Sequence, residues 1–128
     1  MKKKIAILGS TGSIGKCLIN ILKKDQKNIE ISLLAVNKNI NELLKQIKQF
    51  KVKNVIVIDY KKFLYLKKTF IKDNINIYNN FDSINKIFSK NKIDYTMSAI
   101  SGLGGLDPTL KIIEFTKRIA IANKESII

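Results

Sequence analysis

The strongest structural signal in this chain lies near its amino terminus, in residues 4–15, KIAILGSTGSIG. Residues 4–8 form a short apolar run, which is typical of a buried strand, and glycines 9, 12 and 15 follow it directly. Apolar residues then recur at the spacing of one helix face, which predicts a helix with these residues buried: Ile14, Leu18, Ile21 and Leu22. A strand, a glycine turn and a helix in succession indicate the start of a βαβ unit.

The glycine turn has the composition of a phosphate-binding turn. One glycine permits the tight bend, another lets a pyrophosphate approach the backbone, and a third allows the helix to pack closely on the strand. The free N–H groups and the positive end of the helix dipole then attract phosphates, and Thr11 and Ser13 add hydroxyl donors. The alternative is a glycine-rich connection without a ligand, but its place inside a βαβ unit favours dinucleotide binding.

The rest of the chain alternates between strand and helix patterns. Further strands are predicted at residues 29–36, 55–58, 75–78, 95–100 and 118–122. Candidate helix caps precede the intervening apolar stripes, and these are Asn39, Asp59, Asn80 or Asp82, and Asp107 followed by Pro108, whose helix is expected to run to about residue 116. The pattern predicts an α/β fold, a Rossmann-like doubly wound, mainly parallel sheet of about six strands with helices on both faces. Residues 1–128 show no linker and no second domain.

The end of the second predicted strand indicates which dinucleotide would bind. An NAD-specific enzyme usually places Asp or Glu there to hold the ribose 2′-hydroxyl, whereas this chain has Asn37, Lys38 and Asn39. No carboxylate would repel a 2′-phosphate, and the ammonium of Lys38 can pair with one. We therefore expect NADP(H) rather than NAD(H), although lysine is so frequent in this chain that Lys38 by itself is weak evidence.

Two further segments are expected at the carboxyl ends of strands, where ligands of open α/β sheets bind. The first is SAISGLGGL, residues 98–106, whose small residues either leave room for the cofactor or merely turn the chain. The second is Asn123, Lys124 and Glu125, of which Lys124 could meet an anionic substrate or a carbonyl group. Neither segment completes a catalytic constellation.

Composition excludes several chemistries. The chain has no His and a single Cys, Cys17, so it cannot form a zinc site, a Ser-His-Asp triad or an internal disulfide. Its carboxylates do not pair convincingly as metal ligands, and no apolar run approaches the length of a membrane span. The net charge of +14 comes from scattered lysines and one arginine, Arg118, a pattern that does not favour sequence-reading of nucleic acid.

Taken together, four segments resemble the 1-deoxy-D-xylulose 5-phosphate reductoisomerase family. They are GSTGSIG at 9–15, VNKN at 36–39, GLGGLDPTL at 102–110 and IAIANKES at 119–126. The last segment is much more specific than the glycine turn, and the order and spacing of the four also match. The resemblance covers residues 1–128 as an amino-terminal NADPH-binding domain, and it implies that the catalytic, metal-binding and carboxyl-terminal domains are absent from this chain.

The resemblance implies an enzyme of the non-mevalonate isoprenoid pathway. Such an enzyme rearranges 1-deoxy-D-xylulose 5-phosphate and reduces the product with NADPH to 2-C-methyl-D-erythritol 4-phosphate, with Mg²⁺ or Mn²⁺ as Lewis acid. The residues that it implies for cofactor binding are Thr11, Gly12, Ser13, Ile14, Asn37, Lys38, Asn39, Asn123 and Glu125. Lys124 would contact the substrate, and the metal ligands would lie beyond residue 128. The fragment alone is expected to be inactive.

Some expectations depend on the resemblance alone. The full enzyme is expected to be a homodimer in the bacterial cytoplasm, with a mature plastid form as the alternative, and to bind neither nucleic acid nor membrane. Position 37 is often glycine in the family and is Asn here, which narrows the expected adenosine pocket. The alternatives are the cofactor domain of another GxxGxxG NADP-dependent dehydrogenase (an aspartate-semialdehyde dehydrogenase or a dihydrodipicolinate reductase), a basic nucleic-acid-binding module, and a truncated product without activity.

Overall fold

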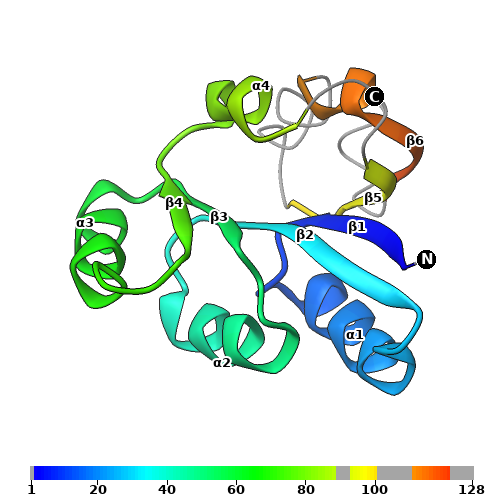
Figure 1. The fold of residues 1–128 in the computed structure, drawn as a ribbon, viewed down its shortest axis with the longest axis horizontal. Coiled ribbons are helices and arrows are strands. Elements are labelled where there is room, and N and C mark those ends of the chain that lie inside the picture. The colour runs from blue at the N-terminus through cyan, green and yellow to red at the C-terminus, as the bar shows by residue number, and fades with distance from the viewer. Residues whose placement is uncertain (1, 89–92, 101–110, 122–128) are drawn as a thin grey trace.

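A computed structural model describes residues 2–88, 93–100 and 111–121 of the chain. Within these residues, six strands form one fully parallel sheet in the order β4-β3-β2-β1-β5-β6 (Figure 1). The strands are β1 (Lys3–Leu8), β2 (Ile29–Val36), β3 (Asn54–Val57), β4 (Asn76–Tyr78), β5 (Ile93–Ser98) and β6 (Thr116–Ile121). The helices are α1 (Ser13–Leu22), α2 (Ile40–Phe50), α3 (Tyr60–Thr69) and α4 (Ile84–Ile87). The predicted Rossmann-like α/β class is confirmed.

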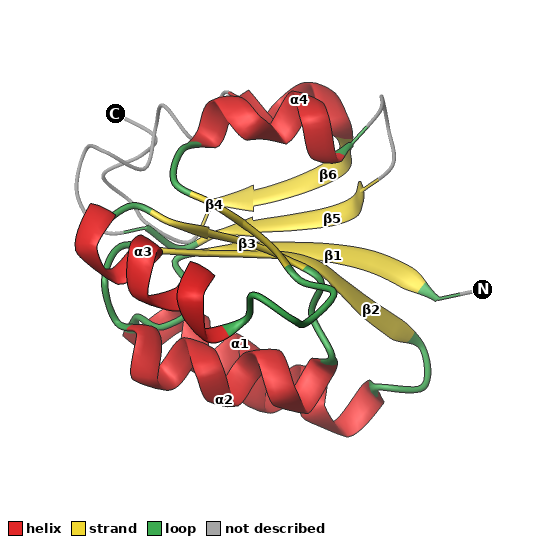
Figure 2. Ribbon diagram, turned by 60° about the vertical axis from the view of Figure 1, so that its left-hand side comes forward, coloured by secondary structure: helices red, strands yellow, loops and turns green. Residues whose placement is uncertain are grey.

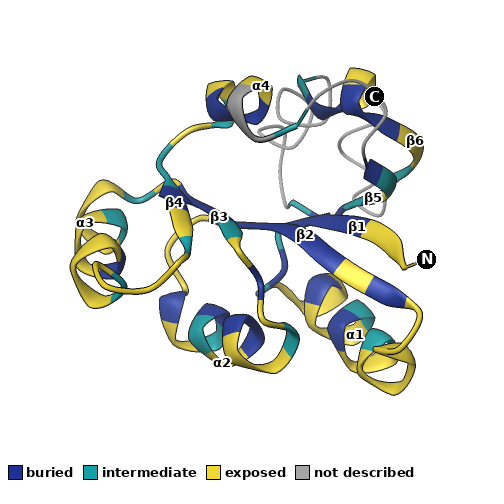
Figure 3. Ribbon diagram, viewed as in Figure 1, coloured by how far each residue is buried: buried dark blue, intermediate teal, exposed yellow. Residues whose placement is uncertain are grey.

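Helices cover both faces of the sheet, as predicted. Figure 2 shows α1, α2 and α3 on one face and α4 on the other. The side chains of β1 alternate between two apolar clusters, with Ile5 and Ile7 on the side of α1–α3 and Ala6 and Leu8 on the opposite side. Because both faces are covered, the central strands are buried almost throughout, whereas the outer sides of the helices are exposed (Figure 3).

Side-chain caps fix where two of the helices begin. The Asn39 side chain accepts a hydrogen bond from the Glu42 N–H at 3.3 Å and starts α2, and the Asp59 carboxylate accepts from the Lys62 N–H at 3.1 Å and starts α3. Both caps were predicted from the sequence. Of the two candidates for the next cap, Asn80 accepts from the Ser83 N–H, so Asn80 is the cap.

The buried face of α1 differs from the prediction. Gly15 and Ile19 are buried and Leu18 and Leu22 are half-buried, but Ile14 is 47% exposed and Ile21 is 64% exposed. The helix is rotated so that Gly15 faces the preceding turn, which carries Ile14 and Ile21 away from the core.

The boundaries in the second half of the chain also differ from the prediction. β5 starts two residues earlier than predicted and ends at Ser98, and Thr116 begins β6 rather than ending a helix. The described part of the predicted 108–116 helix consists of a helical segment at 111–112 and a 3-10 turn, Ile113–Phe115. The register pairs Ile93 of β5 with Thr116, so pairing along the sheet draws Thr116 into the strand.

The strand order places a topological switch point beside β1. From β1 the chain moves outward through β2, β3 and β4 on one side, and then crosses back to β5 and β6 on the other. In open α/β sheets, connections on the two sides of a switch point leave in opposite directions, and a crevice forms at the carboxyl ends of the flanking strands, which here are β1 and β5. Ligands of open α/β sheets bind in such a crevice.

Candidate functional site

The turn that follows β1 is held against its neighbours by short backbone contacts. Gly9 adopts a positive φ of 83° and donates its N–H to the Ala35 carbonyl of β2 at 2.7 Å. A Cβ at Gly9 would lie 2.8 Å from the carbonyl oxygen of Ala99, immediately after β5. Only glycine satisfies both the backbone angle and the close approach, so Gly9 is the tight-bend glycine that the sequence predicts.

Gly15 and Gly12 have different surroundings. A Cβ at Gly15 would lie 2.1 Å from the Gly9 carbonyl oxygen and 2.7 Å from backbone atoms of Ser10, so Gly15 lets α1 pack directly on the turn. A Cβ at Gly12 would meet only the Gly9 oxygen, at 3.8 Å. Space is therefore open beside the backbone of Gly12, where a phosphate group can approach.

The amino terminus of α1 has no side-chain cap among the described residues. Its N-cap residue is Gly12, which has no side-chain oxygen to offer, and the helix begins its backbone bonding with Lys16 N–H to Gly12 O at 2.8 Å. In contrast, α2 and α3 are both capped by side chains. The N–H groups of the first turn of α1 are thus available to an anion, and Thr11, Ser13 and Ile14, predicted to contact the cofactor, lie at this end of the helix.

The predicted 2′-phosphate segment lies at the carboxyl end of the neighbouring strand β2. Asn37, Lys38 and Asn39 are all exposed, and the Asn37 carbonyl accepts the Asp59 N–H at 2.8 Å, which ties the segment to the end of β3. The Asn39 side-chain oxygen caps α2, so its amide nitrogen is the group that can donate outward. The glycine turn and this segment therefore follow adjacent parallel strands, at the same edge of the sheet.

Part of the predicted site lies outside the described residues. Asn123, Lys124 and Glu125 belong to residues 122–128, and residues 101–106 of the SAISGLGGL segment belong to residues 101–110. The described end of β5 reaches this edge with Ser98 and Ala99, both of which are buried. The structure thus brings together the glycine turn, residues 37–39 and the end of β5.

Gln46 also belongs to this region, although no sequence pattern predicted it. It lies on α2, is only 3% exposed, and donates from its side-chain Nε2 to the carbonyl oxygen of Ser10 at 3.0 Å. A glutamine between Lys45 and Ile47 reads as part of a polar helix face. Its position one residue before Ile47 and three after Leu43, both buried, was the only sign that it borders the core.

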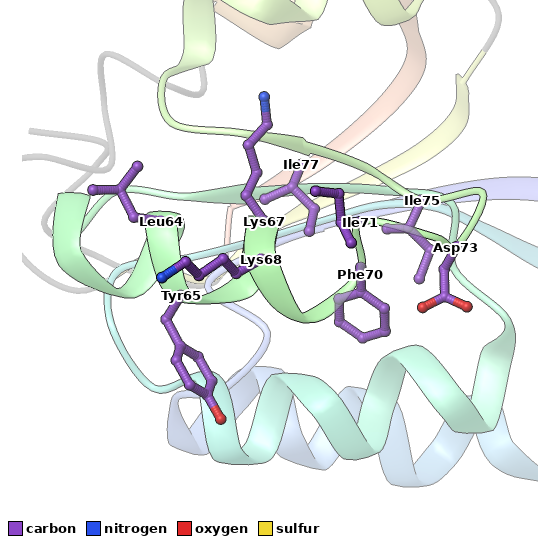
Figure 4. Close-up of a pocket in the computed structure, with 9 residues that line it drawn as sticks. All are labelled: Leu64, Tyr65, Lys67, Lys68, Phe70, Ile71, Asp73, Ile75 and Ile77. Carbon is purple, nitrogen blue, oxygen red and sulfur yellow. The ribbon is translucent and has the colours of Figure 1, made fainter.

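One described groove lies away from this site. It has a volume of about 760 Å³ and runs along α3 and β4 at the edge of the sheet (Figure 4). Its lining combines apolar side chains with two lysines and one aspartate: Leu64, Tyr65, Lys67, Lys68, Phe70, Ile71, Asp73, Ile75 and Ile77. β3 and β2 separate it from β1, so it contains none of the predicted cofactor-binding residues.

Two features are absent from the described residues. No group of three or more His, Cys, Asp or Glu side chains there is placed to hold a metal ion. No helix there is long and apolar enough to cross a membrane.

The parallel sheet, the switch point and the glycine turn with its uncapped helix define a Rossmann-like α/β domain of the dinucleotide-binding class. A family model described as 1-deoxy-D-xylulose 5-phosphate reductoisomerase matches residues 5–128. This chain belongs to the 1-deoxy-D-xylulose 5-phosphate reductoisomerase family, as its sequence motifs suggested.

Curated relatives and solved structures agree with this family. The chain is 64% identical over 127 residues to the reductoisomerase of Pelagibacter ubique (strain HTCC1062), covering 98% of this chain and 33% of the relative. It is 42% identical over 128 residues to that of Endomicrobium trichonymphae, again covering 98% and 33%. The Zymomonas mobilis enzyme solved with NADPH has a TM-score of 0.86 at 28% identity, covering 99% of this chain and 33% of that one.

A further solved reductoisomerase, bound to NADPH, fosmidomycin and magnesium, has a TM-score of 0.85 at 28% identity and covers 98% of this chain and 31% of that one. The chain thus spans about a third of the length of the relatives that it matches.

Proposed function

We propose that residues 1–128 form the NADPH-binding domain of an enzyme that converts 1-deoxy-D-xylulose 5-phosphate to 2-C-methyl-D-erythritol 4-phosphate. The observation that carries this proposal is the glycine turn at the switch point, where α1 starts without a side-chain cap and space is open beside Gly12. These are the features that a pyrophosphate requires. Solved members of the family that hold NADPH support the choice of cofactor.

Two described segments, which follow the adjacent strands β1 and β2, would bind different parts of the cofactor. Thr11, Gly12, Ser13 and Ile14 would bind the pyrophosphate through backbone N–H groups and two hydroxyls. Asn37, Lys38 and Asn39 would bind the 2′-phosphate. When bound, NADPH supplies the hydride for the reduction step. The exposed Lys38 ammonium would pair with the 2′-phosphate, which distinguishes NADPH from NADH, so Lys38 is proposed to set cofactor preference.

The other parts of the site are proposed from the family resemblance. Asn123 and Glu125 would contact the cofactor near its nicotinamide half, and Lys124 would contact the phosphorylated sugar substrate. The magnesium reported in a solved relative suggests a divalent metal for the complete enzyme, with ligands beyond residue 128. A homodimer in the bacterial cytoplasm, without nucleic-acid or membrane partners, remains part of this proposal. The 128-residue chain alone should bind NADPH weakly and should not turn over substrate.

The proposal is tested by titrating the chain with NADPH and with NADH while following cofactor fluorescence. NADPH should bind more tightly, and Lys38→Glu should remove most of that preference by repelling the 2′-phosphate. Lys48→Glu makes the same charge change at an exposed site in the last turn of α2, at the opposite end of that helix from residues 37–39. This variant should preserve the preference for NADPH. Equal affinity of the unaltered chain for both cofactors would contradict the role of Lys38, and no binding of either would contradict the proposed function.

A further inference from the structure

Gln46 makes a buried polar contact between α2 and the glycine turn. Its Nε2 donates to the Ser10 carbonyl oxygen at 3.0 Å, across 36 positions of sequence. Gln46 is 3% exposed and Ser10 is fully buried. Burying an amide side chain is costly unless it is hydrogen-bonded, so a buried glutamine aimed at one backbone carbonyl needs an explanation.

Stability does not explain this glutamine well. The Gln46 Oε1 atom is buried without a hydrogen-bond partner among the described residues, and so is the Ser10 Oγ atom. An unsatisfied buried oxygen offsets much of what one hydrogen bond contributes. An apolar side chain of similar shape would remove the unsatisfied Oε1 oxygen but would also take the Gln46 hydrogen bond from the Ser10 carbonyl, so the two effects on folding free energy oppose each other.

The contact does fix the orientation of one peptide unit. The Ser10 carbonyl and the Thr11 N–H belong to the same planar trans peptide and therefore point in opposite directions. Because Gln46 holds the carbonyl toward α2, the Thr11 N–H is directed away from α2. The Ser10 N–H, which donates to the Ala35 carbonyl at 3.4 Å, belongs to the preceding Gly9–Ser10 peptide and therefore does not orient this one.

We propose that Gln46 is a positioning residue for the cofactor pyrophosphate, acting through the Ser10–Thr11 peptide. This inference rests on the proposed NADPH-binding function. The bond from Gln46 orients the Thr11 N–H toward the phosphate and polarises the peptide so that this N–H donates more strongly. The same helix carries Asn39 at its amino terminus, so α2 links the pyrophosphate turn to the proposed 2′-phosphate segment.

The test compares Gln46→Met with Gln49→Met in the 128-residue chain. Gln49 lies three residues further along α2 and is exposed, so it receives the same substitution without a buried contact. Two ligands are titrated by calorimetry: NADPH, and adenosine 2′-monophosphate, which has the 2′-phosphate but no pyrophosphate. We expect Gln46→Met to bind NADPH about fivefold more weakly, the effect of losing one well-placed hydrogen bond. Its affinity for adenosine 2′-monophosphate should not change, and Gln49→Met should match the unaltered chain with both ligands.

A purely structural role of Gln46 would give a different result, because its loss would weaken the binding of both ligands together. Unchanged NADPH binding by Gln46→Met, or an equal loss with both ligands, would overturn the proposal. If circular dichroism shows that Gln46→Met does not fold, Gln46→Leu, which also lacks a donor and a charge, should show the same selective loss. Failure of both variants to fold would assign Gln46 to stability and likewise overturn the proposal.

The unaltered chain separates this inference from the function on which it rests. If it binds NADPH and Gln46→Met binds equally well, only the role of Gln46 fails. If the unaltered chain does not bind NADPH, the proposed function fails and the role of Gln46 fails with it.

Discussion

Replacing Gly15 by alanine should destabilise this protein, although a glycine-to-alanine substitution in an ordinary helix stabilises that helix. Gly15 lies in the first turn of α1, where alanine would normally be favoured by about 1 kcal/mol through its helix propensity. Here the new Cβ would lie 2.1 Å from the Gly9 carbonyl oxygen and 2.7 Å from the Cα of Ser10. Both neighbours are backbone atoms of a buried turn, so no side chain can rotate away to relieve the overlap.

The size of the effect follows from these opposing contributions. Overpacking a tight core site costs about 1–3 kcal/mol, and contact with backbone puts Gly15 near the upper end of that range. After the propensity gain is subtracted, we expect a net loss of about 2 kcal/mol in the free energy of unfolding. For a domain of this length, such a loss lowers Tm by about 8 °C.

Thermal and urea unfolding followed by circular dichroism measure this change directly. The control is Gly12→Ala, which adds the same methyl group three residues earlier, where the nearest atom is 3.8 Å away. Gly12→Ala should alter the free energy of unfolding by less than about 1 kcal/mol. It should nevertheless weaken NADPH binding, because the methyl group occupies the space proposed for the pyrophosphate. A Gly15→Ala variant as stable as the unaltered chain, or more stable, would refute the close packing of α1 on the turn.

Three further predictions concern stability. Asp59→Ala should cost about 1 kcal/mol through loss of the α3 cap, whereas Asp59→Asn should be nearly neutral in urea unfolding because Asn caps equally well. The Lys4 N–H and the Lys117 ammonium hold the pKa of the Asp94 carboxyl below its ordinary value. A lowered folded-state pKa stabilises the fold above about pH 4, and this stabilisation is lost as pH falls through the folded pKa. Asp94→Asn should therefore be less stable than the unaltered chain at pH 7, and the gap should shrink toward pH 2 in denaturant titrations; a constant gap would contradict the ion pairing. Leu66→Ala removes a fully buried side chain of α3 and should cost about 3 kcal/mol in urea unfolding, and a loss below about 1 kcal/mol would show that this cluster is loosely packed.

Local features of the fold could be predicted from the sequence because each depends on residues close together in the chain. The run 4–8 and the glycines after it predicted β1 and its turn, and Asn39 and Asp59 predicted the starts of α2 and α3. Apolar runs separated by amphipathic stretches predicted the parallel α/β class. The motifs at 9–15 and 119–126 also identified the family, because each is a short continuous segment that can be recognised without its tertiary surroundings.

Strand ends in the second half were predicted less well, because pairing with a neighbouring strand decides them. Thr116 was expected at the end of a helix and instead begins β6, where it pairs with Ile93 of β5. Ile14 and Ile21 follow a helical period, yet both are exposed. The close packing of Gly15 against Gly9 determines which face of α1 meets the sheet. A hydrophobic period alone does not specify such a rotation.

The sequence by itself determined the order of elements, the family and the residue types at the proposed cofactor site, since these depend on composition and on spacing along the chain. Only the tertiary structure decided which glycine does what: Gly9 makes the bend, Gly15 the close packing, and Gly12 leaves open space. It also revealed Gln46, whose role depends on reaching Ser10 across 36 positions. Contacts of this kind arise only when the folded chain brings distant segments together, so no local pattern in the sequence encodes them.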